Sequence, residues 1–201
     1  MPTLHMHQLR VAAVAYQVCD KLNISVDSEN IVKACLLHDM ANIIKMNLSD
    51  FPEFLKPEGY GYWQEVKNNY AHKYQTSDEH KATLAIAKEL GVSERVYELI
   101  EAVGFLQGPE NAASTDYGRK ICAYSDMRVG PHGIISMEDR LIEAAARYTK
   151  KKYKPGERQD PFALALRQIE SNLFSHSSIK PGDIDDKTSE PVIEKLKQYS
   201  I

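Results

Sequence analysis

The sequence predicts an all-α protein, on the basis of two observations. Apolar residues recur at three- and four-residue steps nearly throughout the chain, which is the spacing of one face of a helix. No segment reads convincingly as a β-strand, because strict alternation of apolar and polar residues is missing. The composition is that of a globular protein, since 43% of the 201 residues are hydrophobic and 26% are charged. We therefore expect a helical bundle around one substantial core.

The first predicted helix carries a histidine on its apolar face. Val11, Val14 and Val18 recur at helical spacing, and His7 falls on the same stripe. His5 lies two positions away, about 200° around the helix, so it points elsewhere. His7 is therefore the histidine that we expect to face inward.

The second predicted helix carries an adjacent His-Asp pair. It is expected to begin at Asp27 or Ser28, which are good N-cap residues, and to run through His38 and Asp39 to about Met46. The pair directly follows an apolar run. Burying such ionisable groups costs several kcal/mol unless they are paired, hydrogen-bonded or bound to a metal.

Caps and breakers divide the rest of the chain. Proline and glycine interrupt it between residues 49 and 62, again at Gly108-Pro109, and at Gly130-Pro131. The aromatic segment from Phe51 to Trp63 is expected to pack in the core, or alternatively to form a lid over a nucleobase. Further helices are expected over about 62–73, from a cap at Ser77 or Asp78 to Gly91, from Ser93 onward, and over about 112–129, 136–152 and 160–175. The polar segment from Ser175 to Pro191 is expected to be a loop, followed by a short final helix.

Two units are predicted. Residues 1–155 would form the helical domain, and a linker at Lys154-Pro155-Gly156 would lead to a C-terminal helical extension over 156–201. The helix after Asp160 is amphipathic, so we expect the extension to pack on the domain.

Composition excludes several classes of protein. A net charge of −3 gives no broad basic surface for duplex nucleic acid. No apolar run approaches the roughly 18 residues of a membrane span, and the N-terminus lacks the pattern of a signal peptide. Cys19, Cys35 and Cys122 have no CxxC spacing and are expected to be buried, reduced thiols. These features predict a cytoplasmic protein, with a homodimer left open.

Four side chains could meet at one cation. His7, His38, Asp39 and Asp126 together offer two imidazoles and two carboxylates, as in metal sites built inside helical bundles. Adjacent residues are about 100° apart on a helix, so His38 and Asp39 can converge on a point between their directions. The alternative is structural, with His38 and Asp39 paired to each other and His7 hydrogen-bonded to a backbone carbonyl.

These residues, in this order and each on a predicted helix, resemble the HD-domain superfamily of metal-dependent phosphohydrolases. The resemblance covers roughly residues 3–152. It rests on His7-x-x-Arg10-Val11, Leu36-Leu37-His38-Asp39 and Tyr124-Ser125-Asp126 followed by Arg128. It implies an HD-domain-like bundle in which His7, His38, Asp39 and Asp126 bind a metal and the protein hydrolyses a phosphoester. The expected substrate is a nucleotide or a similar small phosphorylated metabolite.

The donor set bears on which metal is expected. Four protein ligands would complete a tetrahedral zinc site, whereas a six-coordinate ion keeps two positions for water and a phosphate oxygen. We therefore favour one Mn, Fe, Co or Ni ion per chain over Zn. Dinuclear members, such as dinucleoside-polyphosphate hydrolases, carry a further histidine before the last aspartate, and residues 98–105 contain none. A dinuclear hydrolase of that kind remains an alternative.

Several other residues are candidates around the metal. Asp39 and His80 are the expected catalytic residues, and His80 also matches a position at which many family members carry histidine. Asn42 stands where some mononuclear nucleotidases have a glutamate; an amide can orient water or phosphate but cannot transfer a proton as a carboxylate does. Expected substrate-binding residues are Asn42, Lys45, His80 and Arg119. The departure at Asn42 keeps open a non-catalytic domain that binds a nucleotide or a protein partner.

Overall fold

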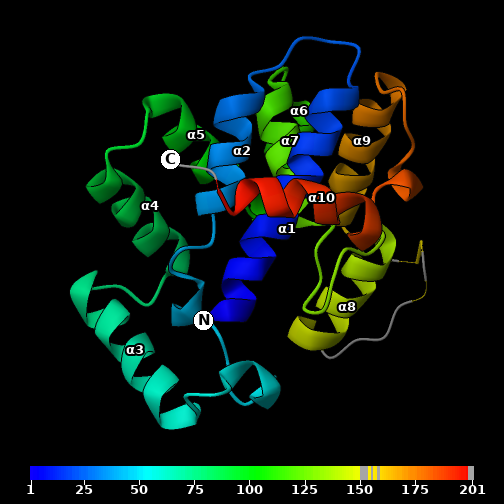
Figure 1. The fold of residues 1–201 in the computed structure, drawn as a ribbon. Coiled ribbons are helices and arrows are strands. Elements are labelled where there is room, and N and C mark those ends of the chain that lie inside the picture. Colours follow the sequence, from blue (N-terminus) through cyan, green and yellow to red (C-terminus); the bar gives the residue numbers. More distant parts are fainter. Residues whose placement is uncertain (150–153, 155, 158, 199–201) are drawn as a thin grey trace.

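The protein is all-α, as predicted. The computed structural model describes residues 1–149, 154, 156–157 and 159–198, and this part contains no β-strand, only two isolated bridges. Figure 1 shows the arrangement of the helices. They are α1 (Pro2–Lys21), α2 (Ser28–Leu37), η1 (Asn42–Ile44), η2 (Pro52–Leu55), α3 (Tyr60–Lys73), α4 (Glu79–Leu90), α5 (Glu94–Ala102), η3 (Phe105–Gln107), α6 (Gly108–Ala113), α7 (Tyr117–Asp126), α8 (Met137–Thr149), α9 (Pro161–Ser175), η4 (Pro181–Asp183) and α10 (Asp186–Leu196).

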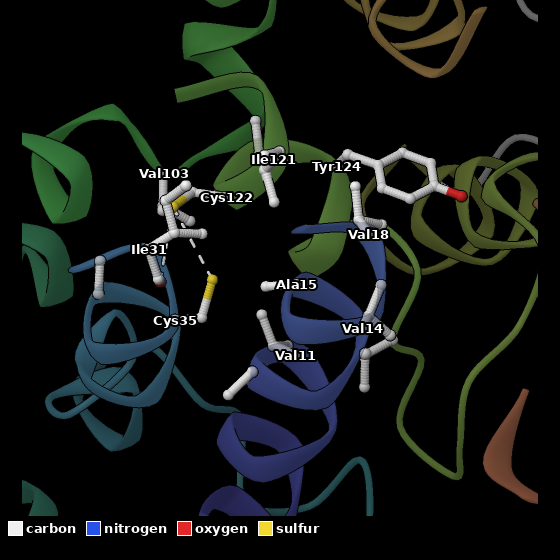
Figure 2. Packing of buried hydrophobic residues seen from close by; sticks show 14 of the residues in the cluster. Val11, Val14, Ala15, Val18, Ile31, Cys35, Val103, Ile121, Cys122 and Tyr124 are labelled. Carbon is white, nitrogen blue, oxygen red and sulfur yellow. Dashed lines mark hydrogen bonds between the residues drawn. The ribbon is translucent and has the colours of Figure 1, made fainter. Parts of the chain in front are cut away.

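Helix α1 is the centre of the molecule. It packs against α2, α7 and α10, and α10 crosses it at the front of Figure 1. Val11, Val14 and Val18 are buried, which confirms the predicted inward stripe. Ala12 and Ala15 are buried as well, and these small side chains let neighbouring helices approach α1 from several sides. Figure 2 shows the α1 residues in contact range of side chains from α2 and α7.

The predicted ends of α4 are confirmed. Asp78 is the N-cap, and its carboxylate accepts hydrogen bonds from the backbone N–H groups of His80 and Lys81, at 3.0 and 3.1 Å. Gly91 follows the last turn with a φ of 68°, a left-handed conformation that glycine adopts without steric cost. The residues that cap this helix could therefore be identified from the sequence.

The predicted end of α2 is wrong, and the difference matters for the site. The helix ends at Leu37, with His38 as its C-cap, and the chain then turns through Asp39 to Ala41 instead of continuing to Met46. Side chains form hydrogen bonds with backbone groups at this turn. His38 Nδ1 lies 2.8 Å from the Cys35 carbonyl oxygen, and Thr83 Oγ1 accepts a hydrogen bond from Ala41 N–H at 3.1 Å. The region contains no glycine or proline that could have indicated a stop.

Two further helix boundaries differ from prediction. The helix expected over 112–129 is divided into α6 and α7, because Asp116 caps α7 and accepts a hydrogen bond from Gly118 N–H at 2.8 Å. The segment expected as loop up to Pro191 contains the start of α10. Asp185 caps α10 and exchanges hydrogen bonds with Thr188. The predicted end of α8 near residue 152 lies outside the described residues.

The C-terminal helices pack on the rest of the chain. Helix α9 contacts α6 and α7, and α10 contacts α1. Polar contacts accompany this packing, since Gln17 on α1 donates to Ser189 Oγ at 2.8 Å and Arg10 donates to Asp186 at 3.2 Å. Of the predicted linker, Lys154 and Gly156 are described, and residue 155 lies outside the described residues.

Arg128 connects the end of α7 to the C-terminal segment. Its guanidinium is buried and donates to the carbonyl oxygens of Ile135, Pro181 and Ile184, at 2.6, 3.1 and 2.9 Å, and also to the Tyr124 hydroxyl. Arg128 is thus a structural residue that ties three parts of the chain together.

The cysteines are buried free thiols, as predicted. Cys35 and Cys122 face each other between α2 and α7 with their sulfur atoms 3.8 Å apart, which is too far for a disulfide (Figure 2). Burial raises the pKa of Cys19 to about 12, so this thiol stays protonated at neutral pH.

None of the helices that the structure describes combines the length and the apolar character that crossing a membrane would require.

Replacing Asp116 with asparagine is expected to lower the free energy of unfolding by about 1 kcal/mol at neutral pH, because this carboxylate both caps α7 and receives two hydrogen bonds from Arg95. The Arg95 hydrogen bonds and charge hold the pKa of Asp116 below its usual value. The carboxylate therefore stabilises the fold fully above its unfolded pKa, near 4, and the contribution is lost as pH falls through the lower folded pKa. Urea unfolding of both proteins at pH 7 and pH 3 checks this, since the difference between them should shrink at the acidic pH.

Candidate metal centre

The four predicted ligands come from three helix ends. His7 lies near the start of α1, His38 caps the end of α2, and Asp39 follows it in the turn. Asp126 is the last residue of α7. The ligands therefore meet where these three helices come together, and Asp39 reaches the site from the turn rather than from the helix that the sequence predicted.

The structure brings these four side chains together. Asp126 Oδ1 lies 3.3 Å from His7 Nε2 and 3.4 Å from His38 Nε2. Asp39 Oδ2 lies 3.5 and 3.7 Å from the same two nitrogen atoms. The two imidazole ring centroids are 5.5 Å apart. Ligand atoms of His7, His38 and Asp39 all lie within 4.8 Å of one another, the one group of its kind among the described residues.

The orientation of His38 suits a metal ligand. A carbonyl oxygen can only accept, so the 2.8 Å contact to Cys35 makes His38 Nδ1 the donor and leaves the Nε2 lone pair directed at the carboxylates. His38 Nε2 is buried and has no hydrogen-bond partner among the described residues. A divalent cation would satisfy this atom, and two imidazoles with two carboxylates are a suitable donor set for one.

The electrostatics of the site favour a cation. Burial would lower the pKa of His38, but the negative charges of Asp39 and Asp126 outweigh burial and raise this pKa to about 9. Burial would likewise raise the pKa of Asp126, yet the imidazoles of His38 and His7, with ring nitrogen atoms 3.4 and 3.3 Å from Asp126 Oδ1, hold it well below its ordinary value. The Asp126 carboxylate therefore stays ionised and contributes a negative potential between the imidazoles.

The site opens into a pocket of about 320 Å³. His7, Asp39 and Asp126 line it, together with Asn42 and Lys45. Asn42 Nδ2 donates to Asp39 Oδ2, so the amide orients a metal ligand. Lys45 donates to Glu79 at 2.8 Å; burial lowers the pKa of Lys45, but the charges of Asp39 and Glu79 raise it by more, so the ammonium stays charged.

Two predicted site residues are not brought to this pocket. His80 lies in the first turn of α4, half-buried, and is not among the lining residues. Arg119 lies in the first turn of α7, at the far end of the helix from Asp126. It donates to Glu110 at 2.6 Å and to Asn111 at 3.0 Å. Seven-residue spacing placed Arg119 on the Asp126 face, but two helical turns separate them along the axis.

The sequence reasoning missed two arginines. Arg140 and Arg147, both on α8, line the pocket. Glu143 lies between them at helical spacing, and this Arg-x-x-Glu-x-x-x-Arg pattern is the signal that could have identified them. Of the aromatic segment, Phe51 and Phe54 line the pocket, whereas Trp63 is buried beneath it in a small core with Ile43, Leu48 and Leu55.

Comparison with known families gives one match. The family model of the HD domain matches residues 4–169. This range includes all four candidate ligands and extends past the domain boundary predicted at residue 155. A search of curated proteins and a search of solved structures each found no match. HD domains are usually metal-dependent hydrolases that bind divalent ions, and the His7, His38 and Asp39 group agrees with that property. On the match over most of its length, this chain belongs to the HD-domain family.

Proposed function

We propose that the protein is a mononuclear metal-dependent phosphohydrolase that acts on a nucleotide or a similar small phosphorylated metabolite. The observation that carries the proposal is the convergence of His7, His38, Asp39 and Asp126 at the wall of a pocket that a lysine also lines. A bound divalent ion would supply a water of lowered pKa and would polarise the phosphoryl group.

The protein's own residues would hold and orient the reacting groups. His7, His38, Asp39 and Asp126 would hold the ion, leaving two positions of a six-coordinate ion for water and substrate. This is why Mn, Fe, Co or Ni is favoured over Zn. Asn42 fixes the Asp39 carboxylate through its hydrogen bond. The charged Lys45 would stabilise negative charge on the phosphoryl oxygens. Because Lys45 already lines the pocket, little reorganisation of its side chain would be needed.

A non-catalytic domain that binds a nucleotide is the second candidate. The observation in its favour is that Asn42 is hydrogen-bonded to Asp39 and His80 does not line the pocket, so neither residue supplies an evident proton donor there. Under this reading the metal and the pocket would bind the phosphate without turnover.

A phosphatase screen separates the two candidates. The purified chain would be assayed with Mn, Co, Ni, Mg and Zn against p-nitrophenyl phosphate, bis-p-nitrophenyl phosphate and nucleoside monophosphates. We expect metal-dependent release of product that Asp39→Asn reduces by about 100-fold or more, since the substitution removes a charged ligand. Nucleotide binding without turnover under any metal would exclude the hydrolase and leave the binding domain.

A further inference from the structure

The pocket has a basic wall that the metal centre does not use. Arg140 and Arg147 lie two turns apart on α8, and both line the pocket. Glu143 lies between them and accepts a hydrogen bond from Arg140 and another from Arg147 Nη2 at 3.2 Å. Arg147 Nε also lies 3.0 Å from Glu143 Oε1 in an ion pair. One carboxylate thus fixes two guanidinium groups, and the triad keeps an excess of one positive charge.

Polar atoms without a hydrogen-bond partner gather in this pocket. Thr3 Oγ1, Asn42 Oδ1 and Arg140 Nε are each buried and have no partner among the described residues, and all three residues line the pocket. Leaving a buried polar atom unpaired is costly, and native proteins keep few such atoms. Because these atoms cluster on one cavity, they indicate a polar ligand, and Arg140 indicates that part of it is an acceptor.

An aromatic wall accompanies the arginines. Phe51 and Phe54 stack with ring centroids 5.0 Å apart, and the Arg147 guanidinium carbon lies 6.0 Å from the Phe51 ring centroid. Apolar surface beside a guanidinium lowers the local dielectric constant and strengthens its attraction for an anion. Asp50 also lines the pocket and opposes this attraction, but it is exposed and accepts from Asn47. Asp39 and Asp126 line the pocket too, and a bound ion would offset their charge.

From these contacts we infer that the ligand carries two anionic groups, one held at the metal centre and the other held by Arg140 and Arg147. The first half rests on the proposed function; the second rests on α8 alone. The chemical class is a small metabolite with a phosphoester and a second phosphate or carboxylate, such as a nucleoside bisphosphate. A monophosphate with a neutral remainder would make no charged contact with this basic wall.

Matched ligand pairs test the inference. Isothermal titration of the manganese-loaded protein would compare AMP with adenosine 3′,5′-bisphosphate, and glucose 1-phosphate with glucose 1,6-bisphosphate, while released phosphate is measured in parallel. Each bisphosphate is expected to bind about 10–100-fold more tightly than its monophosphate, the effect of one additional charge-assisted contact. A phosphorylated carboxylate such as 3-phosphoglycerate, compared with glycerol 3-phosphate, distinguishes a second phosphate from a carboxylate.

Variants locate the effect. Arg140→Gln and Arg147→Gln should abolish the preference, because they lower bisphosphate affinity far more than monophosphate affinity, and Arg147→Lys should keep part of it because the charge remains. Arg119→Gln is the matched control, since Arg119 is also paired with a glutamate but lies outside the pocket. Thermal unfolding of each variant would show that the fold is retained.

The outcomes separate this inference from the proposed function. Turnover without any preference for doubly anionic ligands, or a preference that survives both glutamine variants, would overturn the inference and leave the hydrolase intact. Selective binding without turnover would support the inference while removing the hydrolase proposal. Equal, weak binding of every ligand without turnover would overturn both.

Discussion

Replacing His7 with alanine is expected to abolish stoichiometric metal binding, whereas replacing His5 should leave it unchanged. Both histidines are on α1, two residues apart, but His7 Nε2 lies 3.3 Å from Asp126 Oδ1 and His5 is exposed. Disturbing a residue that supports a ligand typically costs about 10–100-fold in metal affinity, so loss of the ligand itself should cost more than ~100-fold. Metal per chain, measured by elemental analysis after dialysis, should fall from about one to near zero.

The same experiment tests the rest of the site. Asn42→Ala removes only the hydrogen bond to Asp39, so its metal affinity should fall between those of the His5 and His7 variants. A His7 variant that retained full metal content would mean that the ion, if bound, is held elsewhere. In that case the four residues would form an ordinary polar cluster.

The largest expected effect on stability comes from Arg128→Met. Removing the guanidinium takes the donor from the buried Ile184 carbonyl oxygen and Tyr124 hydroxyl, and from the part-buried carbonyl oxygens of Ile135 and Pro181. It also takes away the positive charge that opposes the rise in the pKa of half-buried Glu170. An unpaired buried polar group costs about 1–3 kcal/mol, so we expect a loss of about 3–5 kcal/mol in the free energy of unfolding.

Arg119→Met is the control for this prediction. Arg119 lies on the same stretch of chain and also makes hydrogen bonds, but its partner Glu110 is exposed and only one buried acceptor, Asn111 Oδ1, would lose its donor, so the loss should be about 1–2 kcal/mol. Urea unfolding followed by circular dichroism measures both variants. If Arg128→Met lost no more stability than Arg119→Met, the buried contacts would not hold the C-terminal segment in place.

The sequence predicted the helices whose ends are encoded locally. Asp78 and Gly91 bound α4 because a carboxylate accepts from the first-turn N–H groups and glycine tolerates a left-handed turn, and both are visible as residue types. The end of α2 was not predictable in this way. Met40 and Ala41 are residues that favour helix, and the turn there depends on Thr83, which is distant in the sequence.

Only the part of the candidate site that is encoded by residue order and type could be predicted from the sequence. The ligands were found by their order and residue types, and the structure brings His7, His38, Asp39 and Asp126 together. The residues around them depend on how helices pack. Spacing along one helix suggested Arg119, whereas the arginines of the pocket, Arg140 and Arg147, come from a different helix whose position the sequence alone did not specify.

Because α10 crosses α1, the point at which the protein is truncated affects its stability. The family match ends at residue 169, within α9, yet α10 and the acceptors Pro181 and Ile184 lie beyond that point. A fragment trimmed to the matched region would expose apolar surface of α1 to water and strip the guanidinium of Arg128 of two acceptors. The region matched by the family is therefore shorter than the region that packs as one structure. A truncated protein for biophysical work should end after Leu196, not at the edge of the matched domain.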